Sequence, residues 1–280
     1  MKTWKRPKLF GRTLPMDLLI GFVLIVFILL AGFTGRYVVK GNPLTVDGEA
    51  ILLPPSFAHP FGTDNFGRDV LVRILHAAPI DLQMGLFMML PGLLIGTSLG
   101  CLMGYRGGLL DTFFMRLIDL LVAFPGFVVL LACVAFIGPG ISTLYIAAAV
   151  FNWMDYARLI RGQMLVERQL DYVNAAFVLG YDHRRILFIH ILPNIFTQSL
   201  VLASTGFVQG ILAGSGLSFL GFGVPPPIPE WGAMINEGRL YLLQAPWISG
   251  SPGLIIVAVA AAFTLFGDGL ADFFAPEAKQ

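Results

Sequence analysis

Apolar residues along this chain fall into six long blocks, separated by segments that are polar or rich in Pro and Gly. Each block is close to the roughly 20 residues that an α-helix needs to cross the hydrocarbon core of a bilayer. The pattern therefore predicts an all-α membrane protein with about six transmembrane helices. Their predicted ranges are 16–33, 82–104, 115–137, 141–157, 195–220 and 252–274.

Two of the six blocks have unusual flanks. The block at 16–33 follows a basic stretch, as a secretory signal would, but its apolar run is long and no small-residue cleavage site follows. We therefore interpret it as an uncleaved first span. The block at 141–157 is separated from the third only by Gly138-Pro139-Gly140, a helix-breaking turn, and its uninterrupted part ends at Asp155.

The unequal distribution of Lys and Arg predicts the orientation of the chain. Short cytoplasmic loops of membrane proteins carry an excess of these residues. With the N-terminal tail inside, six spans place most of the 18 Lys and Arg residues on the cytoplasmic side. We therefore expect a multi-pass protein with both termini in the cytoplasm.

This orientation assigns each segment to one side of the membrane. Two external segments are expected, and both are rich in Pro and Gly. The predicted segments are a cytoplasmic basic tail (1–15), the first span with an external segment (16–80), the main transmembrane domain (81–275) with a cytoplasmic loop (158–194) and a second external segment (221–251), and a cytoplasmic tail (276–280).

Composition agrees with the lipid bilayer as the main solvent. Only 12% of the residues are charged and 56% are apolar, against about 25% and 45–50% in soluble domains. The 18 basic residues are balanced by 17 acidic ones, and no basic run is interleaved with aromatic residues, which argues against nucleic acid as a partner. Cys101, Cys133 and the four scattered His residues show no metal-ligand spacing, so no metal site is expected.

Small residues recur every four positions in two of the predicted spans. This spacing places a smooth groove along one face of each helix, where another backbone can approach closely. The groove either packs within the chain or forms a surface shared with a second subunit, and the spacing leaves both alternatives open. The residues are Gly92, Gly96, Gly100 and Gly104 in the second span, and Gly206, Gly210, Gly214 and Ser218 in the fifth.

The predicted cytoplasmic segment 171–193 is too long and too patterned for a simple connector. Ala175, Ala176 and Leu179 fall on one side of a short helix by their spacing. Gly180 can end that helix with a left-handed residue. The segment is therefore expected to form a helix-turn-helix.

Two roles are open for this short helix. Its small alanines suit insertion into a groove on a partner protein. Alternatively, the helix lies on anionic lipid, with Arg184 and Arg185 at the headgroups. Pro193 then marks the expected start of the next helix.

The loop also resembles a known motif. The run Asn174-Ala175-Ala176, three residues, Gly180, nine residues and then His190-Ile-Leu-Pro193 is similar to the E-A-A-x3-G-x9-I-x-L-P loop of ATP-binding-cassette importer permeases. Asn174 replaces the usual Glu and His190 the usual Ile. Docking is therefore expected to depend on shape and on Gly180 more than on an acidic first residue. The coupling-loop residues that this resemblance implies are Tyr172, Asn174, Ala175, Ala176, Leu179, Gly180, Leu192 and Pro193.

Further blocks in the same order narrow the family. They resemble the C-type permease subunit of binding-protein-dependent importers for dipeptides, oligopeptides and nickel, and the resemblance covers about residues 16–275. The blocks are HPFGTDNFGRD (59–69), YARLIRG (156–162), GLSFLG (216–221), WGAM (231–234), APW (245–247) and LFGDGL (265–270).

The resemblance implies partners and a location. It implies a homologous second permease subunit, two cytoplasmic ATPases and an external solute-binding protein, all at a bacterial inner membrane. This chain contains no G-x4-G-K-[ST] phosphate loop, so ATP and Mg would be bound by the partner ATPases and this chain would be a transport subunit without a cofactor or enzymatic activity. Peptides are the expected cargo, and nickel or another small solute is the alternative within the family.

A few charged or polar residues in the predicted spans are candidates for other roles. Asp119 and Asn152 are candidates for the substrate path. Spacing along the helix also predicts two structural ion pairs, Arg116 with Asp119 and Asp155 with Arg158. An ion-coupled carrier without ATPases would require carboxylates or histidines at mid-depth in broken helices, and only Asp119 comes near that pattern.

On the outer side, three charged residues follow the first span. Asp64, Arg68 and Asp69 either hold the external segment together or meet the solute-binding protein. Turn-rich segments with Asp usually satisfy their own backbone groups, which favours the first interpretation.

Overall fold

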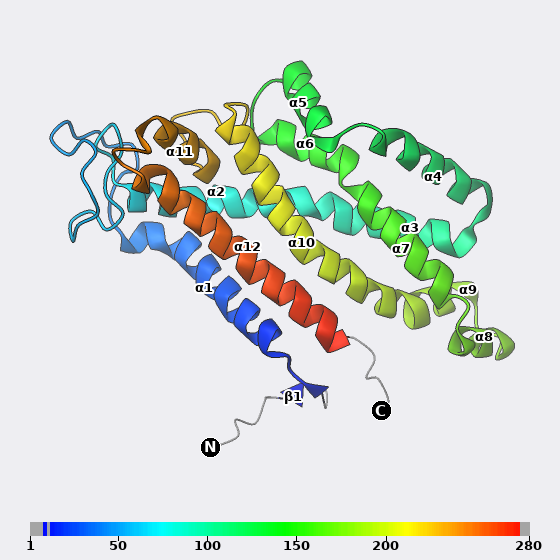
Figure 1. The fold of residues 1–280 in the computed structure, drawn as a ribbon. Coiled ribbons are helices and arrows are strands. Elements are labelled where there is room, and N and C mark those ends of the chain that lie inside the picture. The colour runs from blue at the N-terminus through cyan, green and yellow to red at the C-terminus, as the bar shows by residue number, and fades with distance from the viewer. Residues whose placement is uncertain (1–7, 10–11, 275–280) are drawn as a thin grey trace.

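The computed structural model describes residues 8–9 and 12–274 as a set of long, closely packed helices (Figure 1). A short antiparallel pair, β1 (Lys8–Leu9) and β2 (Arg12–Thr13), precedes them. Two predicted tails are affected by this limit. Residues 1–7 and 10–11 of the tail predicted at 1–15, and the whole tail predicted at 276–280, lie outside the described residues. The prediction of an all-α membrane fold is confirmed.

The helices follow one another with few long connections. In chain order they are α1 (Met16–Val38), α2 (Val70–Pro91), η1 (Gly92–Gly96), α3 (Thr97–Arg106), α4 (Gly108–Val122), α5 (Gly126–Ile137), α6 (Ile141–Phe151), α7 (Trp153–Glu167), α8 (Asp171–Val178), α9 (His183–Arg185), η2 (Ile186–Ile191), α10 (Leu192–Phe219), α11 (Trp231–Gly238), η3 (Arg239–Tyr241) and α12 (Trp247–Phe274).

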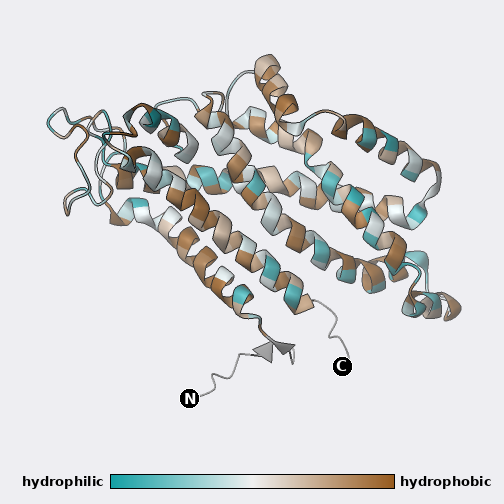
Figure 2. Cartoon of the chain, in the orientation of Figure 1, coloured by the Kyte–Doolittle hydropathy of each residue, from teal (hydrophilic) through white to brown (hydrophobic). Residues whose placement is uncertain are grey.

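By length and composition, four continuous helices of the described chain could cross a membrane. They are Met16–Val38, Val70–Arg106, His183–Phe219 and Trp247–Phe274, and α4 with α5 makes a fifth if the bent pair counts as one span. Figure 2 shows hydrophobic residues along most of α1 and α12. The predicted count of six spans is therefore not confirmed.

The prediction of one helix over 115–137 is wrong. The chain bends by 82° between α4 and α5, at Ala123 to Pro125. Pro125 lacks a backbone N–H and disfavours helical geometry in the residue before it, so α4 ends and α5 starts anew at Gly126. The block at 141–157 likewise divides at Asn152 into α6 and α7.

Helix α2 starts much earlier than the predicted boundary at residue 82. The side chain of Asp69 accepts a hydrogen bond of 2.9 Å from the backbone N–H of Val72 and so caps the first turn. His59 holds the same carboxylate, with 2.8 Å between Nδ1 and Oδ2. The first turns of α2 therefore extend beyond the apolar block.

The glycine-rich faces pack within the chain. A Cβ atom built on Gly100 would lie 2.6 Å from the carbonyl oxygen of Ala157 in α7. One built on Gly210 would lie 3.0 Å from Cβ of Met88 in α2. Such close approach of backbones is the usual role of small residues in membrane helices. Of the two alternatives left open by the sequence, packing inside the chain is the one observed.

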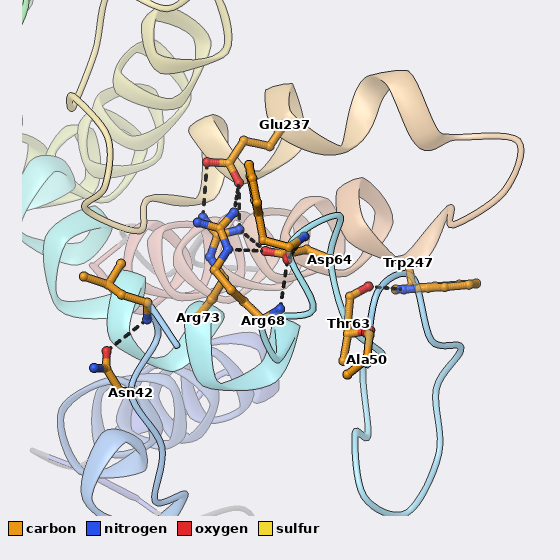
Figure 3. Close-up of polar contacts among 10 residues, drawn as sticks. Asn42, Ala50, Thr63, Asp64, Arg68, Arg73, Glu237 and Trp247 are labelled. Carbon is orange, nitrogen blue, oxygen red and sulfur yellow. Dashed lines mark hydrogen bonds and ion pairs between the residues drawn. The ribbon is translucent and has the colours of Figure 1, made fainter. Parts of the chain in front are cut away.

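An ionic network joins the segment 39–69 to α2 and α11 (Figure 3). Arg73, whose side chain is 2% exposed, donates to Asp64 at 2.7 Å and to Glu237 at 2.7 Å. Arg68 bridges the same two carboxylates at 2.6 and 2.8 Å. Two positive and two negative groups thus neutralise each other in a mostly buried site, as buried charges require. Asp64 and Arg68 hold this segment together, which is the favoured interpretation of the sequence.

Helix α11 is fixed between α2 and α10 by its first residues. The carboxylate of Glu230 accepts hydrogen bonds from the backbone N–H groups of Gly232 and Ala233, at 2.9 and 2.8 Å. The buried indole of Trp231 donates to the carbonyl oxygen of Ile74 at 3.2 Å. The segment 39–69 and α11 form one end of the molecule, which we call the cap end, and α8 lies at the opposite end (Figure 1).

Candidate functional site

The predicted helix-turn-helix is present at the end opposite the cap end. Helix α8 stops at Val178, and Gly180 follows with φ of +77°, the left-handed conformation that was predicted. The backbone N–H of Tyr181 donates to the carbonyl oxygen of Ala176 at 3.1 Å and closes the turn. This turn sends the chain back toward α10.

The next helix begins ten positions before Pro193, so its predicted start is wrong. Helical backbone runs without a break from His183 through the π-helical segment η2 into α10. Leu192 and Pro193 lie in the first turn of α10 itself. The wider π-helical turn directly before the proline accommodates a residue that cannot donate a backbone hydrogen bond.

Helix α8 has one face packed on the chain and one face free. Val173 and Ala176 are buried, at 0% and 4% exposure, among apolar residues of α7, η2 and α10. Ala175 and Leu179 are exposed, so the prediction that Ala176 lies on the same side of the helix as these two residues is wrong. The residues that face the core, Val173 and Ala176, are three positions apart.

The free face carries small and apolar side chains. Val178 is 88% exposed and Leu179 is 71% exposed. We call the exposed residues Asn174, Ala175, Val178 and Leu179 the α8 outer face. The side-chain amide of Asn174 donates a hydrogen bond to the carbonyl oxygen of Gln169 at 3.3 Å. This bond stabilises the start of α8, at a position where the resembling loops carry a charged glutamate.

A polar cluster ties α8 to both neighbouring helices. The hydroxyl of Tyr172 donates to the carboxylate of Glu167, at the end of α7, over 2.6 Å. The amide of Asn194, in the first turn of α10, donates to the same carboxylate at 3.0 Å and to the Tyr172 hydroxyl at 3.2 Å. We call Glu167, Tyr172 and Asn194 the Tyr172 clamp.

The clamp hydroxyl keeps its proton. Burial and the neighbouring Glu167 carboxylate raise the pKa of Tyr172 to about 12, so at neutral pH the phenol is a hydrogen-bond donor. Sequence reasoning identified Tyr172 and missed Glu167 and Asn194, although Asn194 directly follows the Leu192-Pro193 motif. Because Glu167 and Asn194 are 27 positions apart, no local pattern indicates their contact.

The predicted ion pairs are replaced by a pair between helices. Arg158 of α7 contacts Asp119 of α4 at 3.2 Å, and both side chains are exposed. Among the described residues, neither Arg116 with Asp119 nor Asp155 with Arg158 forms an ion pair, so both predictions are wrong. A second contact between α4 and α7, from Arg161 to Asp111, shows why: the two helices lie close enough for cross-helix partners to compete with local ones.

Of the two predicted substrate-path residues, Asn152 lies at the wall of a hollow. A hollow of about 470 Å³ lies between α2, α5, α6, α7 and α10, and Asn152 lines it together with Asp155, Thr205 and Gln209. The amide of Asn152 donates to the carbonyl oxygen of Met88 at 2.8 Å. Asp119 does not line this hollow. The role of both residues in transport stays a prediction.

No metal-binding group is present among residues 8–9 and 12–274, where no three His, Cys, Asp or Glu side chains gather closely enough to hold an ion. The site described above consists of hydrogen-bonding, charged and apolar side chains. Such groups can bind and guide a solute and can transmit a movement.

Comparison with known proteins agrees with this arrangement. Residues 96–280 match the family described as "Binding-protein-dependent transport system inner membrane component". A glutathione transport system permease protein of Pectobacterium atrosepticum is 43% identical over 81% of this chain and 75% of its own length. A dipeptide transport system permease protein of Haemophilus influenzae is 37% identical over 94% of this chain and 91% of its own length.

A third relative is named for another kind of dipeptide. A probable D,D-dipeptide transport system permease protein of Escherichia coli is 39% identical over 91% of this chain and 86% of its own length. The three relatives cover 81–94% of this chain, and the family match includes the predicted coupling loop. The chain thus belongs to the inner-membrane permeases of binding-protein-dependent transport systems, the peptide and nickel class of ATP-binding-cassette importers.

Proposed function

We propose that this chain is one of two permease subunits of an ATP-driven importer for small peptides that an external solute-binding protein delivers. The observation that carries the proposal is the set of relatives, which match most of the chain and are named for dipeptide, D,D-dipeptide and glutathione transport. Glutathione is itself a tripeptide, so the three names share one chemical class. The nickel alternative gains no support from the described residues, where no metal-binding group is found.

In this proposal the two ends of the molecule face different compartments. The end with α8 lies in the cytoplasm together with both termini, and the cap end faces outward. A homologous second permease covers one side of the chain, next to the hollow of about 470 Å³ that α7 helps to line. Each permease contacts one of two ATPases, and here the α8 outer face provides the contact. The exposed Val178 and Leu179 support this choice of surface.

In this proposal the Tyr172 clamp transmits the movement of the ATPases from α8 to the transmembrane helices. ATP binding would draw the two ATPases together and displace α8 with them. Because the clamp joins α8 to the end of α7 and the start of α10, both helices would follow and the cavity between them would change the side to which it opens. The two arrangements, with the cavity open to one side or to the other, are in equilibrium. ATP shifts this equilibrium only to the extent that it binds one arrangement more tightly than the other.

Reconstitution tests the proposal. Liposomes would contain this permease, its homologous partner and the two ATPases, with the binding protein outside and labelled alanyl-alanine as the probe. We expect uptake to require both ATP and the binding protein, and to stop when the lysine of the ATPase phosphate loop is replaced. Uptake without the ATPases would refute ATP drive. A binding protein that purifies with a metal ion and binds no peptide would refute the cargo.

A further inference from the structure

An unpaired carboxylate, that of Asp155, lies in the first turn of α7. Among the described residues, the side chain of Asp155 is exposed and has no ion pair or hydrogen bond. Its neighbours fix its depth. Asn152 bonds to the carbonyl oxygen of Met88, and Tyr156 bonds to that of Leu202. Met88 and Leu202 each lie near the middle of a helix of 37 residues that could cross the membrane, so Asp155 is also near mid-depth.

A carboxylate at this depth needs water or a partner. Charged groups in the hydrocarbon region are costly, and they almost always face a bundle interior or a water-filled cavity. Asp155 points away from the core of its own chain. It borders both the hollow of about 470 Å³ and a second hollow of about 480 Å³ that continues along α7. The two hollows thus meet at this residue.

The basic residues nearby are engaged elsewhere. Arg158, one turn along α7, contacts Asp119 at 3.2 Å, and Arg161 is paired with Asp111 of α4. Arg116 lies on α4 and forms no ion pair among the described residues. On the other walls of the hollow of about 470 Å³, α10 offers the uncharged Gln209, and α2, α5 and α6 offer no charged side chain. The hollow is therefore negative at one point, Asp155.

Uncharged polar groups surround this point. The amides of Asn152 and Gln209 and the hydroxyl of Thr205 line the same hollow, while most of the remaining wall is apolar. A pocket with an apolar wall and a few converging polar groups is the usual form of a small-ligand site. A single carboxylate among hydrogen-bonding amides suits a ligand with an ammonium group and peptide bonds.

We propose that Asp155 lines the water-filled path on the side covered by the second permease and binds the ammonium group of the passing peptide. This inference rests on the proposed function, because it takes peptides as the cargo. The attraction between an ammonium group and a carboxylate is strengthened by a charge-assisted hydrogen bond. The neighbouring amides then meet the backbone of the peptide without selecting its side chains.

A labelling experiment tests the charge of the path without relying on the binding protein. In the assembled transporter, with Cys101 and Cys133 replaced by alanine, Gln209→Cys would be treated with a cationic and an anionic methanethiosulfonate reagent. We expect the cationic reagent to be favoured by on the order of tenfold, and the preference to disappear in Asp155→Asn and to survive in Asp155→Glu. Phe27→Cys on α1, where the native side chain is 67% exposed on an apolar helix, should react slowly with both reagents.

Three outcomes of the labelling would overturn the inference. A cysteine at position 209 that reacts with neither reagent means that the hollow holds no water. Equal preference with and without the Asp155 carboxylate means that this group does not set the local charge. Loss of the second permease on purification of Asp155→Asn means that Asp155 pairs with a base of that subunit instead of with substrate.

Uptake of alanyl-alanine separates this inference from the proposed function. We expect uptake to fall by on the order of tenfold in Asp155→Asn and to be restored in Asp155→Glu, with all subunits still co-purifying. Full uptake by Asp155→Asn would overturn the role of Asp155 and leave the importer intact. A wild-type transporter that moves no peptide with ATP and the binding protein would instead refute the proposed function.

Discussion

Replacement of Gly100 by alanine should force α3 and α7 apart. The added Cβ would lie 2.6 Å from the carbonyl oxygen of Ala157 and 2.9 Å from Cβ of Ile160. Ordinary contacts of such atoms begin near 3.4 Å, so the helices must separate by the better part of an ångström. Overpacking of this kind costs about 1–3 kcal/mol, and the obstructing atoms are a backbone oxygen and a Cβ, neither of which can swing away.

The better helix propensity of alanine opposes this cost. It contributes up to about 1 kcal/mol relative to glycine, which leaves a net loss of up to about 2 kcal/mol for Gly100→Ala. Gly253→Ala is the matched control, because a Cβ on Gly253 in α12 would meet no atom within 4 Å. That variant should keep the propensity gain, so the two substitutions are expected to change stability in opposite directions.

Thermal unfolding of the purified chain in detergent would measure both effects. For chains of this size, 1 kcal/mol corresponds to roughly 2–4 °C in Tm, so Gly100→Ala should unfold a few degrees earlier than the wild type and Gly253→Ala slightly later. If both variants shift in the same direction, or if Gly100→Ala is as stable as the wild type, the helices are not in close contact at Gly100 and the reasoning fails.

Four further substitutions test other parts of the structure. Arg73→Met leaves a buried carboxylate without one of its two partners and should lower the free energy of unfolding by about 3–5 kcal/mol; a loss below about 1 kcal/mol in detergent unfolding would contradict the ionic network. Tyr172→Phe removes the clamp hydroxyl, and because this hydrogen bond is partly exposed we expect a loss of about 1 kcal/mol, seen as amide exchange about fivefold faster in residues 171–178; unchanged exchange would exclude the clamp. Gly180→Val places a β-branched residue at φ of +77°, at a cost of about 1–2 kcal/mol, and should reduce uptake while the protein still reaches the membrane; normal uptake would remove the role of that glycine. Val178→Asp puts a charge on the α8 outer face, where the native side chain is 88% exposed, so the chain should stay folded but co-purify with less ATPase; full recovery of the ATPase would place the contact elsewhere.

Features that depend on neighbours in the sequence could be predicted from the sequence. Apolar blocks near bilayer length predicted where helices lie, because lipid leaves a chain few other ways to satisfy its backbone groups. The left-handed Gly180 followed from its place after a short amphipathic helix. The glycine spacing predicted close helix contacts, although it could not tell that α7 and α2 of the same chain provide the opposing surfaces.

Features that depend on distant residues were missed or wrong. The rule that charges three positions apart pair on a helix failed for Arg158 because α4 brings Asp119 within 3.2 Å. The clamp between Glu167 and Asn194 joins residues 27 positions apart. Ala176 was grouped with Ala175 and Leu179 because spacing alone does not say which face of a short helix meets the protein. The apolar run at 115–137 concealed the bend at Pro125, since hydropathy is insensitive to backbone geometry.

Helix α8 keeps its attachment and its free surface on separate sides. Val173, Ala176 and the Tyr172 clamp hold it to the permease, whereas Val178 and Leu179 contribute nothing to that attachment. Under the proposed function, substitutions on the α8 outer face would therefore alter the choice of ATPase without weakening the attachment of α8 to the permease. Paralogous importers could exchange motor subunits by drift at a few surface positions, and an engineer could retarget this permease by grafting the same few side chains.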